Sequence, residues 1–275
     1  FIMSVSVPVV IHKLLEPLVH RFLNVDDDAN ELSSRIKLVI EEQSQLQPSQ
    51  TAFNNVLSKF LSSGQDLLNF NDVKALPRDS VKCKIAGLAI FDCLVDVNDE
   101  VFSQSRTEIC NLILKVLENE RLPLPVLMAA ALSLGHFARI ASTTEVEFLK
   151  DSPLPSAFQL LQDQRSESHR YAGCIILTQL AINSPALIFA ERKKLFKFIW
   201  DAMCDRNEIV REAAAETLRA GLKLVSQRES MSSYIKMALN SIMGPLNNFS
   251  SAVEKVVGSL NILNIIISGT ITNSE

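Results

Sequence analysis

The sequence predicts an all-α protein built from stacked helical hairpins, and two observations support this prediction. The chain has only 8 glycines and 6% aromatic residues, a composition that disfavours β-sandwiches and suits helices. Five similar segments also recur along the chain, at steps of 43, 43, 41 and 43 residues. A period in the low forties is typical of proteins whose repeating unit is a helical hairpin. The segments begin at Ala86, Ala129, Ala172, Ala213 and Val256.

The aligned segments share features that suit close helix packing. In four of them the first two residues are small, as at Ala86-Gly87 and Ala172-Gly173, which lets neighbouring helices approach closely. Each segment is therefore interpreted as the inner helix of a HEAT-type hairpin. The last segment has Asn261 in the sixth column, so we expect a divergent or terminal unit there. The sixth column of the other segments is large: Phe91, Leu134, Leu177 and Leu218.

The first 79 residues match this repeat only in outline. Apolar residues at helical spacing predict helices over 8–24 and 49–65. The acidic run Asp26 to Asp28 is expected to begin a second helix that extends through Ile40, because carboxylates stabilise a helix N-terminus. A polar turn or loop is expected over 69–79.

From residue 80 onward, proline and polar turns separate the predicted helices. Leu122 to Pro125 interrupts one pair, and Pro153 with Pro155 is expected to disturb another helix, because proline cannot continue a helix. A turn is expected at Asp205 to Asn207, and a frayed end over 269–275. The predicted helices span 80–96, 103–119, 126–141, 144–162, 165–183, 185–204, 208–227, 232–243 and 250–268.

These elements predict one domain, a HEAT-type α-solenoid over residues 1–275 that winds as a right-handed superhelix. Clear repeat units are expected over about 80–268, and divergent N-terminal helices over 1–79. A solenoid buries each hairpin only against its neighbours and exposes long ridges, so protein partners are the expected ligands.

Charge and cysteine content argue against several classes of function. The net charge of −4 disfavours nucleic-acid binding, which usually needs a basic surface. The five cysteines contain no C-x-x-C pair, so we expect the reduced, buried thiols of a cytosolic protein. The apolar stretch 256–271 contains Asn261 and Asn264 and is too short and polar to span a bilayer, so no membrane insertion is expected.

No motif for catalysis or for cofactor binding is present in the sequence. The histidines form no H-x-x-x-H pair that could hold zinc from one helical face, and His136 is interpreted as a packed or half-exposed side chain rather than a ligand. Phosphate-binding glycine loops and a G-x-S-x-G nucleophile motif are also absent. We therefore expect no catalytic, metal-binding or cofactor-binding residue and no small-molecule ligand. The four histidines are His12, His20, His136 and His169.

The most basic cluster lies in the predicted outer helix at 185–204. This cluster could dock an acidic partner or a lipid head group, and the alternative is a solvated helix face. Trp200, in the same helix, is expected in the core rather than as an exposed binding anchor. The cluster comprises Arg192, Lys193, Lys194 and Lys197.

One turn has the spacing of a HEAT unit. Asp205 is followed five and six residues later by Val210 and Arg211. In HEAT hairpins, an Asp in the turn and an Arg early in the inner helix can pair across adjacent repeats, and the Asp also caps a helix N-terminus. We interpret these residues as structural.

The stretch from His169 to Ser230 is more specific than a generic repeat. It contains, in order, Arg-Tyr-Ala, Phe-Ile-Trp, an Asp turn, Val-Arg-Glu and Leu-Arg-Ala. With these elements the chain resembles the N-terminal HEAT region of the target of rapamycin (TOR) kinases, although Asn207 stands where a Lys or His is common. The signature residues are Arg170, Tyr171, Ala172, Trp200, Asp205, Val210, Arg211, Glu212, Leu218 and Arg219.

The resemblance implies a function for the segment. TOR is a serine/threonine protein kinase whose catalytic domain lies far C-terminal to this region, so the resemblance implies a non-catalytic scaffold in nutrient and growth signalling. It implies contacts with a raptor-type subunit, a second TOR protomer and a small GTPase. The implied location is the cytoplasm, including the vacuolar or lysosomal membrane surface reached through partners.

Two other interpretations remain open at this point. A stand-alone helical-repeat adaptor, of the transport or phosphatase-scaffold type, would share the repeat without the kinase. An enzyme that acts through this segment is the third. The apolar residues from Ile262 to Ile267 suggest that another repeat follows, so the chain is expected to be one piece of a longer superhelix.

Overall fold

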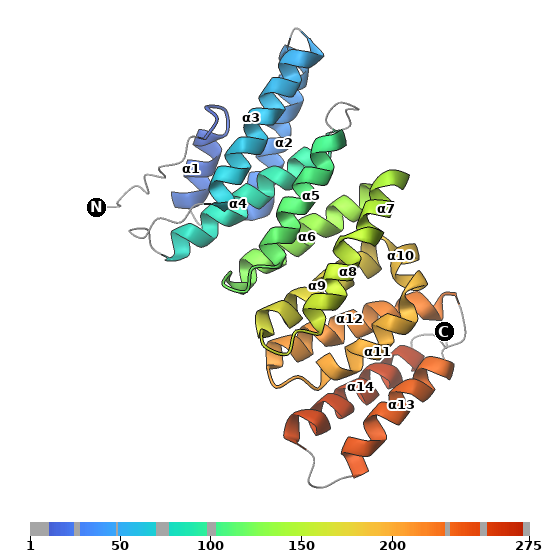
Figure 1. Cartoon of the computed structure of the whole chain (residues 1–275). Coiled ribbons are helices and arrows are strands. Elements are labelled where there is room, and N and C mark those ends of the chain that lie inside the picture. The colour runs from blue at the N-terminus through green and yellow to red at the C-terminus, as the bar shows by residue number, and fades with distance from the viewer. Residues whose placement is uncertain are drawn as a thin grey trace. The chain divides into compact units, whose positions relative to one another are not determined.

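In the computed structural model, every regular element of the described residues is an α-helix (Figure 1). These residues are 11–24, 28–47, 49–69, 77–97, 103–228, 232–247 and 252–271. The all-α prediction is confirmed for this part of the chain, and its helices pack as successive hairpins. None of these helices is both long and apolar enough to cross a membrane.

The chain divides into two compact units. Unit 1 comprises Phe1–Val116 and Leu122–Ile140, and unit 2 comprises Leu117–Arg121 and Ala141–Glu275. The expectation of one solenoid over 1–275 therefore stays a prediction, and we treat each unit by itself.

Unit 1 is organised around its fourth helix, α4. This helix packs against α1, α2, α3 and α6, and its Ile90, Phe91 and Leu94 are fully buried. Burial on several sides explains why its sequence is apolar over most of its length. The helices of unit 1 are α1 (Glu16–Asn24), α2 (Ala29–Leu46), α3 (Gln50–Leu68), α4 (Pro77–Val95), α5 (Ser103–Leu117) and α6 (Leu124–Ile140).

Unit 2 has a second such helix, α9, at its core. It packs against α8, α10 and α12, and every residue from Tyr171 to Leu177 is buried. At the C-terminal side of the unit, α14 packs against α11, α12 and α13. The helices of unit 2 are α7 (Thr143–Asp151), α8 (Pro153–Leu161), α9 (Glu167–Asn183), α10 (Pro185–Ala190), α11 (Arg192–Met203), α12 (Glu208–Ser226), α13 (Ser232–Asn247) and α14 (Val253–Ile271).

Short polar side chains begin several of these helices. Asp28 caps α2 by accepting from the Asn30 amide, and Ser166 caps α9 by accepting from the His169 amide. The cap of α12 is Asn207, whose side chain accepts from the Ile209 amide at 2.9 Å. The prediction that Asp205 caps this helix was therefore wrong, because Asn207 is the residue that directly precedes the first turn.

Proline explains two differences between the predicted and observed helices. The first helix begins at Glu16 and not at residue 8, since Pro17 would break a longer helix in its middle but is tolerated in a first turn. The helix predicted over 144–162 is two helices, α7 and α8, and Pro153 is the first residue of α8. The N-terminal residues 1–10, the acidic residues 26–27, most of the loop at 69–79 and residues 272–275 lie outside the described part of the chain.

The helix predicted over 185–204 also divides, without a proline at the break. It separates into α10 and α11 at Glu191, whose amide is hydrogen-bonded to the Ile188 carbonyl at 3.1 Å. Arg192 then donates from Nη1 to the Phe189 carbonyl at 2.9 Å, which satisfies a carbonyl at the end of α10. The break was not predictable from helical periodicity, because the apolar spacing continues across Glu191.

Small residues in the second column of the repeat lie against neighbouring backbone, as predicted. A Cβ atom added at Gly173 would come within 2.6 Å of the Leu161 nitrogen and 2.7 Å of the Ala157 carbonyl oxygen. One added at Gly87 would come within 2.7 Å of the Gly64 carbonyl oxygen. These separations are shorter than a real Cβ contact, so the helices can pack this closely only because glycine lacks that atom.

Burial corrects the alignment of the last repeat by one residue. Asn261 is exposed, whereas the next residue, Ile262, is buried. Moving the start of this segment from Val256 to Val257 places Gly258 in the second column, where an added Cβ would clash with the Met203 carbonyl. Ile262 then occupies the sixth column, which is also fully buried in the other four segments. The last repeat is therefore less divergent than we predicted.

Candidate interaction surface

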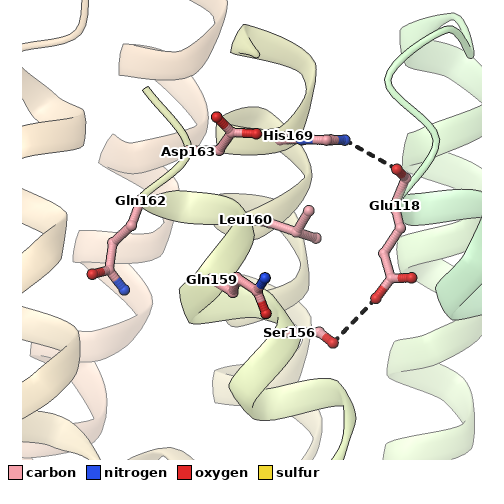
Figure 2. A pocket seen from close by; sticks show the side chains of 7 residues that line it. All are labelled: Glu118, Ser156, Gln159, Leu160, Gln162, Asp163 and His169. Atoms are coloured by element: carbon pink, nitrogen blue, oxygen red, sulfur yellow. Dashed lines mark hydrogen bonds and ion pairs between the residues drawn. The ribbon is translucent and has the colours of Figure 1, made fainter. Parts of the chain in front are cut away.

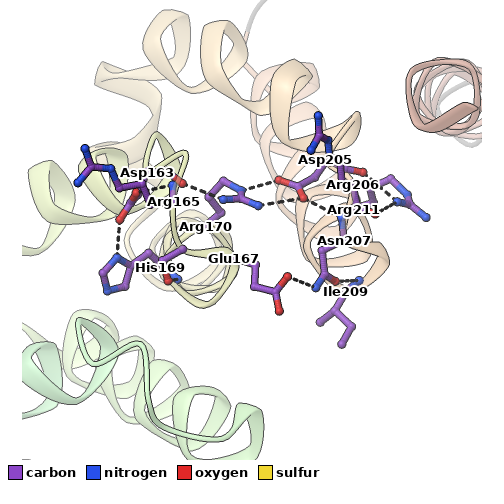
Figure 3. A network of polar contacts seen from close by, with 11 residues as sticks. Asp163, Arg165, Glu167, His169, Arg170, Asp205, Arg206, Asn207, Ile209 and Arg211 are labelled. Carbon is purple, nitrogen blue, oxygen red and sulfur yellow. Dashed lines mark hydrogen bonds and ion pairs between the residues drawn. The ribbon is translucent and has the colours of Figure 1, made fainter. Parts of the chain in front are cut away.

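A network of charged side chains links the N-terminal end of α9 to the turn before α12 (Figure 3). Arg170 donates from Nε to Asp205 Oδ2 at 2.5 Å and from Nη2 to Asp205 Oδ1 at 3.2 Å. Its Nη1 also donates to the Asp163 carbonyl at 2.9 Å. The Arg170 side chain is 16% exposed and the Asp205 side chain 8%, so the pair is largely shielded from water. The hydrogen bonds to Asp205 raise the pKa of Arg170 further.

The turn that contains Asp205 is held by further hydrogen bonds. Asp205 Oδ1 accepts from the Asn207 amide at 2.8 Å. Arg211 reaches back from α12 and donates to the carbonyls of Asp205 and Arg206 at 2.8 and 2.9 Å. Asn207 Nδ2 donates to Glu167 Oε2 of α9 at 2.8 Å. These contacts connect one hairpin to the next and leave Arg170 and Asp205 committed to structure.

Beside this network lies a pocket of about 510 Å³ (Figure 2). His169 stands at one end, where Nδ1 is 2.7 Å from Asp163 Oδ2 and Nε2 is 3.0 Å from the Glu118 carbonyl oxygen. Both neighbours are acceptors, so both ring nitrogens donate, which is the arrangement of an imidazolium. Ser156 stands at the other end, and its Oγ donates to Glu118 Oε1 at 3.1 Å. The lining residues are Glu118, Ser156, Gln159, Leu160, Gln162, Asp163 and His169.

The electrostatics of this pocket do not suit nucleophilic catalysis. Burial alone would lower the pKa of His169, but the hydrogen bonds with Asp163 and the Glu118 carbonyl outweigh it and raise that pKa. The hydrogen bond from His169 in turn lowers the pKa of Asp163. With both nitrogens engaged as donors, His169 has no lone pair to act as a base toward Ser156. The pocket offers hydrogen bonds and carboxylates, without an activated nucleophile.

The predicted basic cluster lies on α11 and is exposed at all three lysines. We call Lys193, Lys194 and Lys197 the α11 basic surface. Arg192, at one end of it, is half-buried and donates from Nε to the Tyr234 hydroxyl at 3.0 Å. Its guanidinium lies 4.3 Å from the centre of the Phe189 ring, and that of Arg228 lies 5.0 Å from the same ring.

Half of the ten predicted signature residues are buried and serve packing. Trp200 is buried and stacks on Phe196 with ring centres 5.8 Å apart, which confirms its expected place in the core. Its indole N–H is buried with no hydrogen-bond partner in the described residues. Glu212 and Arg219 are exposed, and Arg219 pairs with Glu216 on the same helix. The buried members are Tyr171, Ala172, Trp200, Val210 and Leu218.

Unit 1 contains a polar cluster that the sequence analysis did not identify. His136 of α6 lies with Nδ1 at 2.8 Å from Asp92 Oδ1 and Nε2 at 2.7 Å from Asp96 Oδ1. Lys37 of α2 lies with Nζ at 2.6 Å from Asp96 Oδ2. The hydrogen bond with Asp92 raises the pKa of His136 above its usual value, against the opposing effect of burial. The sequence places Asp92 and Asp96 on one helical face and His136 one repeat later, and this pattern could have indicated the cluster.

None of the five cysteines, all of which lie in the described residues, forms a disulfide. Cys83, Cys93, Cys110 and Cys174 are buried, as expected, and Cys204 is half-buried. Burial raises the pKa of both Cys93 and Cys174 to about 12, so neither forms a thiolate near neutral pH. No group of three His, Cys, Asp or Glu residues suited to a metal ion occurs in the described ranges.

Comparison with curated proteins relates the chain to TOR kinases. It is 37% identical to serine/threonine-protein kinase tor1 of Schizosaccharomyces pombe over 97 residues, which are 35% of this chain. It is 26% identical to serine/threonine-protein kinase TOR of Oryza sativa over 239 residues, 86% of this chain. The Arabidopsis thaliana TOR kinase is 35% identical over 118 residues, 42% of this chain. The resemblance to TOR kinases is therefore confirmed across yeast and plant proteins.

These matches concern a small part of the relatives. The chain spans 4% of the S. pombe protein, 9% of the rice protein and 5% of the Arabidopsis protein. No protein-family profile matches the chain. Among solved structures, a designed armadillo repeat protein aligns over 92% of this chain and all of its own length, with 15% identity and a TM-score of 0.42. A likeness at that TM-score adds nothing to the argument.

Proposed function

We propose that this chain is a HEAT-repeat scaffold segment of a TOR-type kinase and contributes no catalytic group to it. The observation that supports this most is the similarity to TOR kinases over 86% of the chain, combined with a fold of successive helical hairpins. The proposed role is to assemble the complex. The proposed partners are a raptor-type subunit, a second TOR protomer and a small GTPase, in the cytoplasm or at the vacuolar or lysosomal surface.

The polar side chains of the described residues are consistent with this proposal. Arg170 with Asp205 and His136 with its two aspartates connect helices to one another, and the guanidinium and the imidazole of these contacts are largely shielded from water. The histidine in the pocket donates from both nitrogens and has no free base to offer. A surface built of stacked hairpins acts through shape and charge, which suits a scaffold.

A binding experiment tests the proposal. The purified chain is immobilised and exposed to the raptor-type subunit from the same organism, with an unrelated HEAT-repeat protein of similar length as the control. We expect saturable binding to the chain and none to the control. Incubation of the chain with ATP and a protein substrate should give no phosphate transfer, and transfer would contradict the scaffold role. Failure to bind the subunit would favour the stand-alone adaptor.

A further inference from the structure

The α11 basic surface lies in the most cationic region of unit 2. Helices α8 and α10 contain no charged residue, and α11 contains four cations and a single carboxylate, Asp201, close to its C-terminal end. The chain as a whole has a net charge of −4, so this part of unit 2 differs in sign from the protein around it. Such a local reversal of charge attracts an acidic partner and orients it.

The lysines of this surface are not neutralised by carboxylates of the described residues. In the described residues, no carboxylate forms an ion pair with Lys193, Lys194 or Lys197, whereas Lys37 pairs with Asp96 at 2.6 Å. Two of the three lie near aromatic rings instead. Lys194 Nζ is 4.4 Å from the centre of the Phe158 ring, and Lys197 Nζ is 5.4 Å from that of Phe198. A ring attracts the cation but accepts no strong hydrogen bond, so the ammonium N–H groups stay available to an anion.

The position of these cations in the helix is unfavourable for folding. Lys193 and Lys194 lie in the first turn of α11, where the helix macrodipole already presents partial positive charge. Each cation there costs about 0.3–1 kcal/mol relative to a neutral residue. Glu191, at the N-cap position, makes no side-chain hydrogen bond that would cap the helix. The Phe158 ring offsets part of this cost at Lys194. Two cations kept at an unfavourable surface position are a departure from local rules of the kind found at functional sites.

We propose that the α11 basic surface docks an acidic, extended segment of a protein partner. This inference rests on the proposed scaffold function and names the chemistry of one of its contacts. Lys193 and Lys197 are one helical turn apart, about 6 Å along the axis, which is close to the spacing of about 6.6 Å between alternate residues of an extended chain. Carboxylates at alternate positions of the segment therefore meet lysines on one face of the helix.

A protein segment fits this surface better than a membrane does. Helices α8, α10 and α11 expose no large apolar side chain in the described residues that could insert into a bilayer. Three lysines alone contribute about 1 kcal/mol each at an anionic membrane, too little for stable attachment. A peptide can instead place its carboxylates directly against the ammonium groups.

The test uses the whole chain and a fluorescein-labelled peptide of alternating Glu and Ser, measured by anisotropy at about 50 mM salt, where charge contacts are weakly screened. The triple variant K193E/K194E/K197E should bind at least about tenfold more weakly than the unchanged chain. The control variant K115E/K223E/K236E changes the charge equally at other exposed lysines and should bind as the unchanged chain does. Circular dichroism checks that both variants keep their helix content.

Three outcomes would overturn the docking surface. They are no binding of the peptide to the unchanged chain, equal weakening in both variants, and binding to phosphatidylserine vesicles in place of the peptide. The raptor-type subunit is measured against the same variants, which separates the two proposals. If the unchanged chain binds the subunit but not the peptide, the docking surface alone is overturned, whereas absence of subunit binding by the unchanged chain overturns the scaffold role.

Discussion

The two units hold their hairpins together with charged contacts of different chemistry. In unit 1, the imidazole of His136 lies between Asp92 and Asp96 and connects α6 to the C-terminal end of α4. In unit 2, the guanidinium of Arg170 connects α9 to Asp205 in the turn before α12. Both contacts join successive repeats, and in both the cationic side chain is largely shielded from water. They differ in whether the cation can lose its proton near neutral pH.

This difference predicts different responses to pH. Arginine stays protonated throughout the range in which proteins are stable, so the Arg170–Asp205 contact is constant there. Histidine changes charge near neutral pH, so the His136 contact can be lost. The same architectural task is therefore performed by a permanent contact in unit 2 and by a pH-sensitive one in unit 1.

The largest loss of stability should follow from removing Asp205, the anion of the Arg170–Asp205 contact. D205A leaves the Arg170 guanidinium shielded from water without its partner and removes the acceptor of the Asn207 amide. We expect a loss of about 3 kcal/mol in the local stability of α9 and α12, measured by hydrogen exchange. The double variant R170M/D205A should recover part of this loss, because no unpaired charge remains. A single variant as stable as the unchanged chain would show that the contact is dispensable.

The second prediction compares substitutions at two glycines and tests whether close helix packing contributes as much to stability as the charged contact does. In G173A, the new Cβ atom would meet the backbone of Leu161 and Ala157, so α8 and α9 must move apart at a cost of about 2 kcal/mol. Gly244 of α13 has no atom within 4 Å of its added Cβ, so G244A should be stabilising by up to about 1 kcal/mol through helix propensity. Urea unfolding measures both. Equal effects of the two substitutions would contradict the close approach of α8 and α9.

The third prediction concerns the pH-sensitive contact itself. The pKa of His136 is raised on folding, so its stabilisation is complete below the unfolded value of about 6.5 and is lost as pH rises through the raised pKa. Protection of α4 and α6 amides should therefore fall over that range, after correction for intrinsic exchange. In H136Q, which should cost about 1 kcal/mol at low pH, this dependence should disappear.

The control for this prediction is the other buried contact. Amides of α12, which Arg211 and Asp205 hold, should show little change in protection over the same pH range. H169Q removes the histidine of unit 2, whose pKa is also raised, and should leave the pH response of α4 and α6 unchanged. A response in α4 that survives H136Q would assign the effect to another group.

The smallest effect is expected at the exposed ion pair of α12. Arg219 and Glu216 lie three residues apart, with side chains 51% and 66% exposed. R219A should change stability by less than about 0.5 kcal/mol, because solvent screens such pairs and fixing two long side chains costs entropy. Calorimetry at low and high salt measures this. A large loss would mean that Arg219 makes a contact beyond its helix.

Local patterns in the sequence were sufficient for most of the helices. The second-column glycines and the buried sixth column lie where the 43-residue period predicted them, because inner helices repeat the same packing problem in every unit. The break at Glu191 and the cap at Asn207 were missed, since helical periodicity does not show local hydrogen bonds such as those of Arg192 with the Phe189 carbonyl and of Asn207 with the Ile209 amide. The last repeat was misaligned by one residue because Asn261 and Ile262 are adjacent and only burial distinguishes them.

The candidate surface was predicted only in part. The basic residues of α11 were visible as a run of like charges, and the structure places all three lysines in solvent. Their lack of carboxylate partners and their position over Phe158 and Phe198 could not be read from the run itself. The contact of Lys194 with Phe158 depends on α8, which lies far from α11 in the sequence and beside it in the fold.

By itself, the sequence determined that this protein is all-α and repetitive, and that it resembles TOR kinases. These properties follow from residue type and spacing, which act over one helical turn or one repeat. The tertiary structure decided which charges are paired. His136 lies 44 residues from Asp92 and Arg170 lies 35 from Asp205, so packing alone brings them together. Packing also decides which lysines of α11 have no carboxylate partner among the described residues, and that is the physical reason the proposed docking surface required the fold.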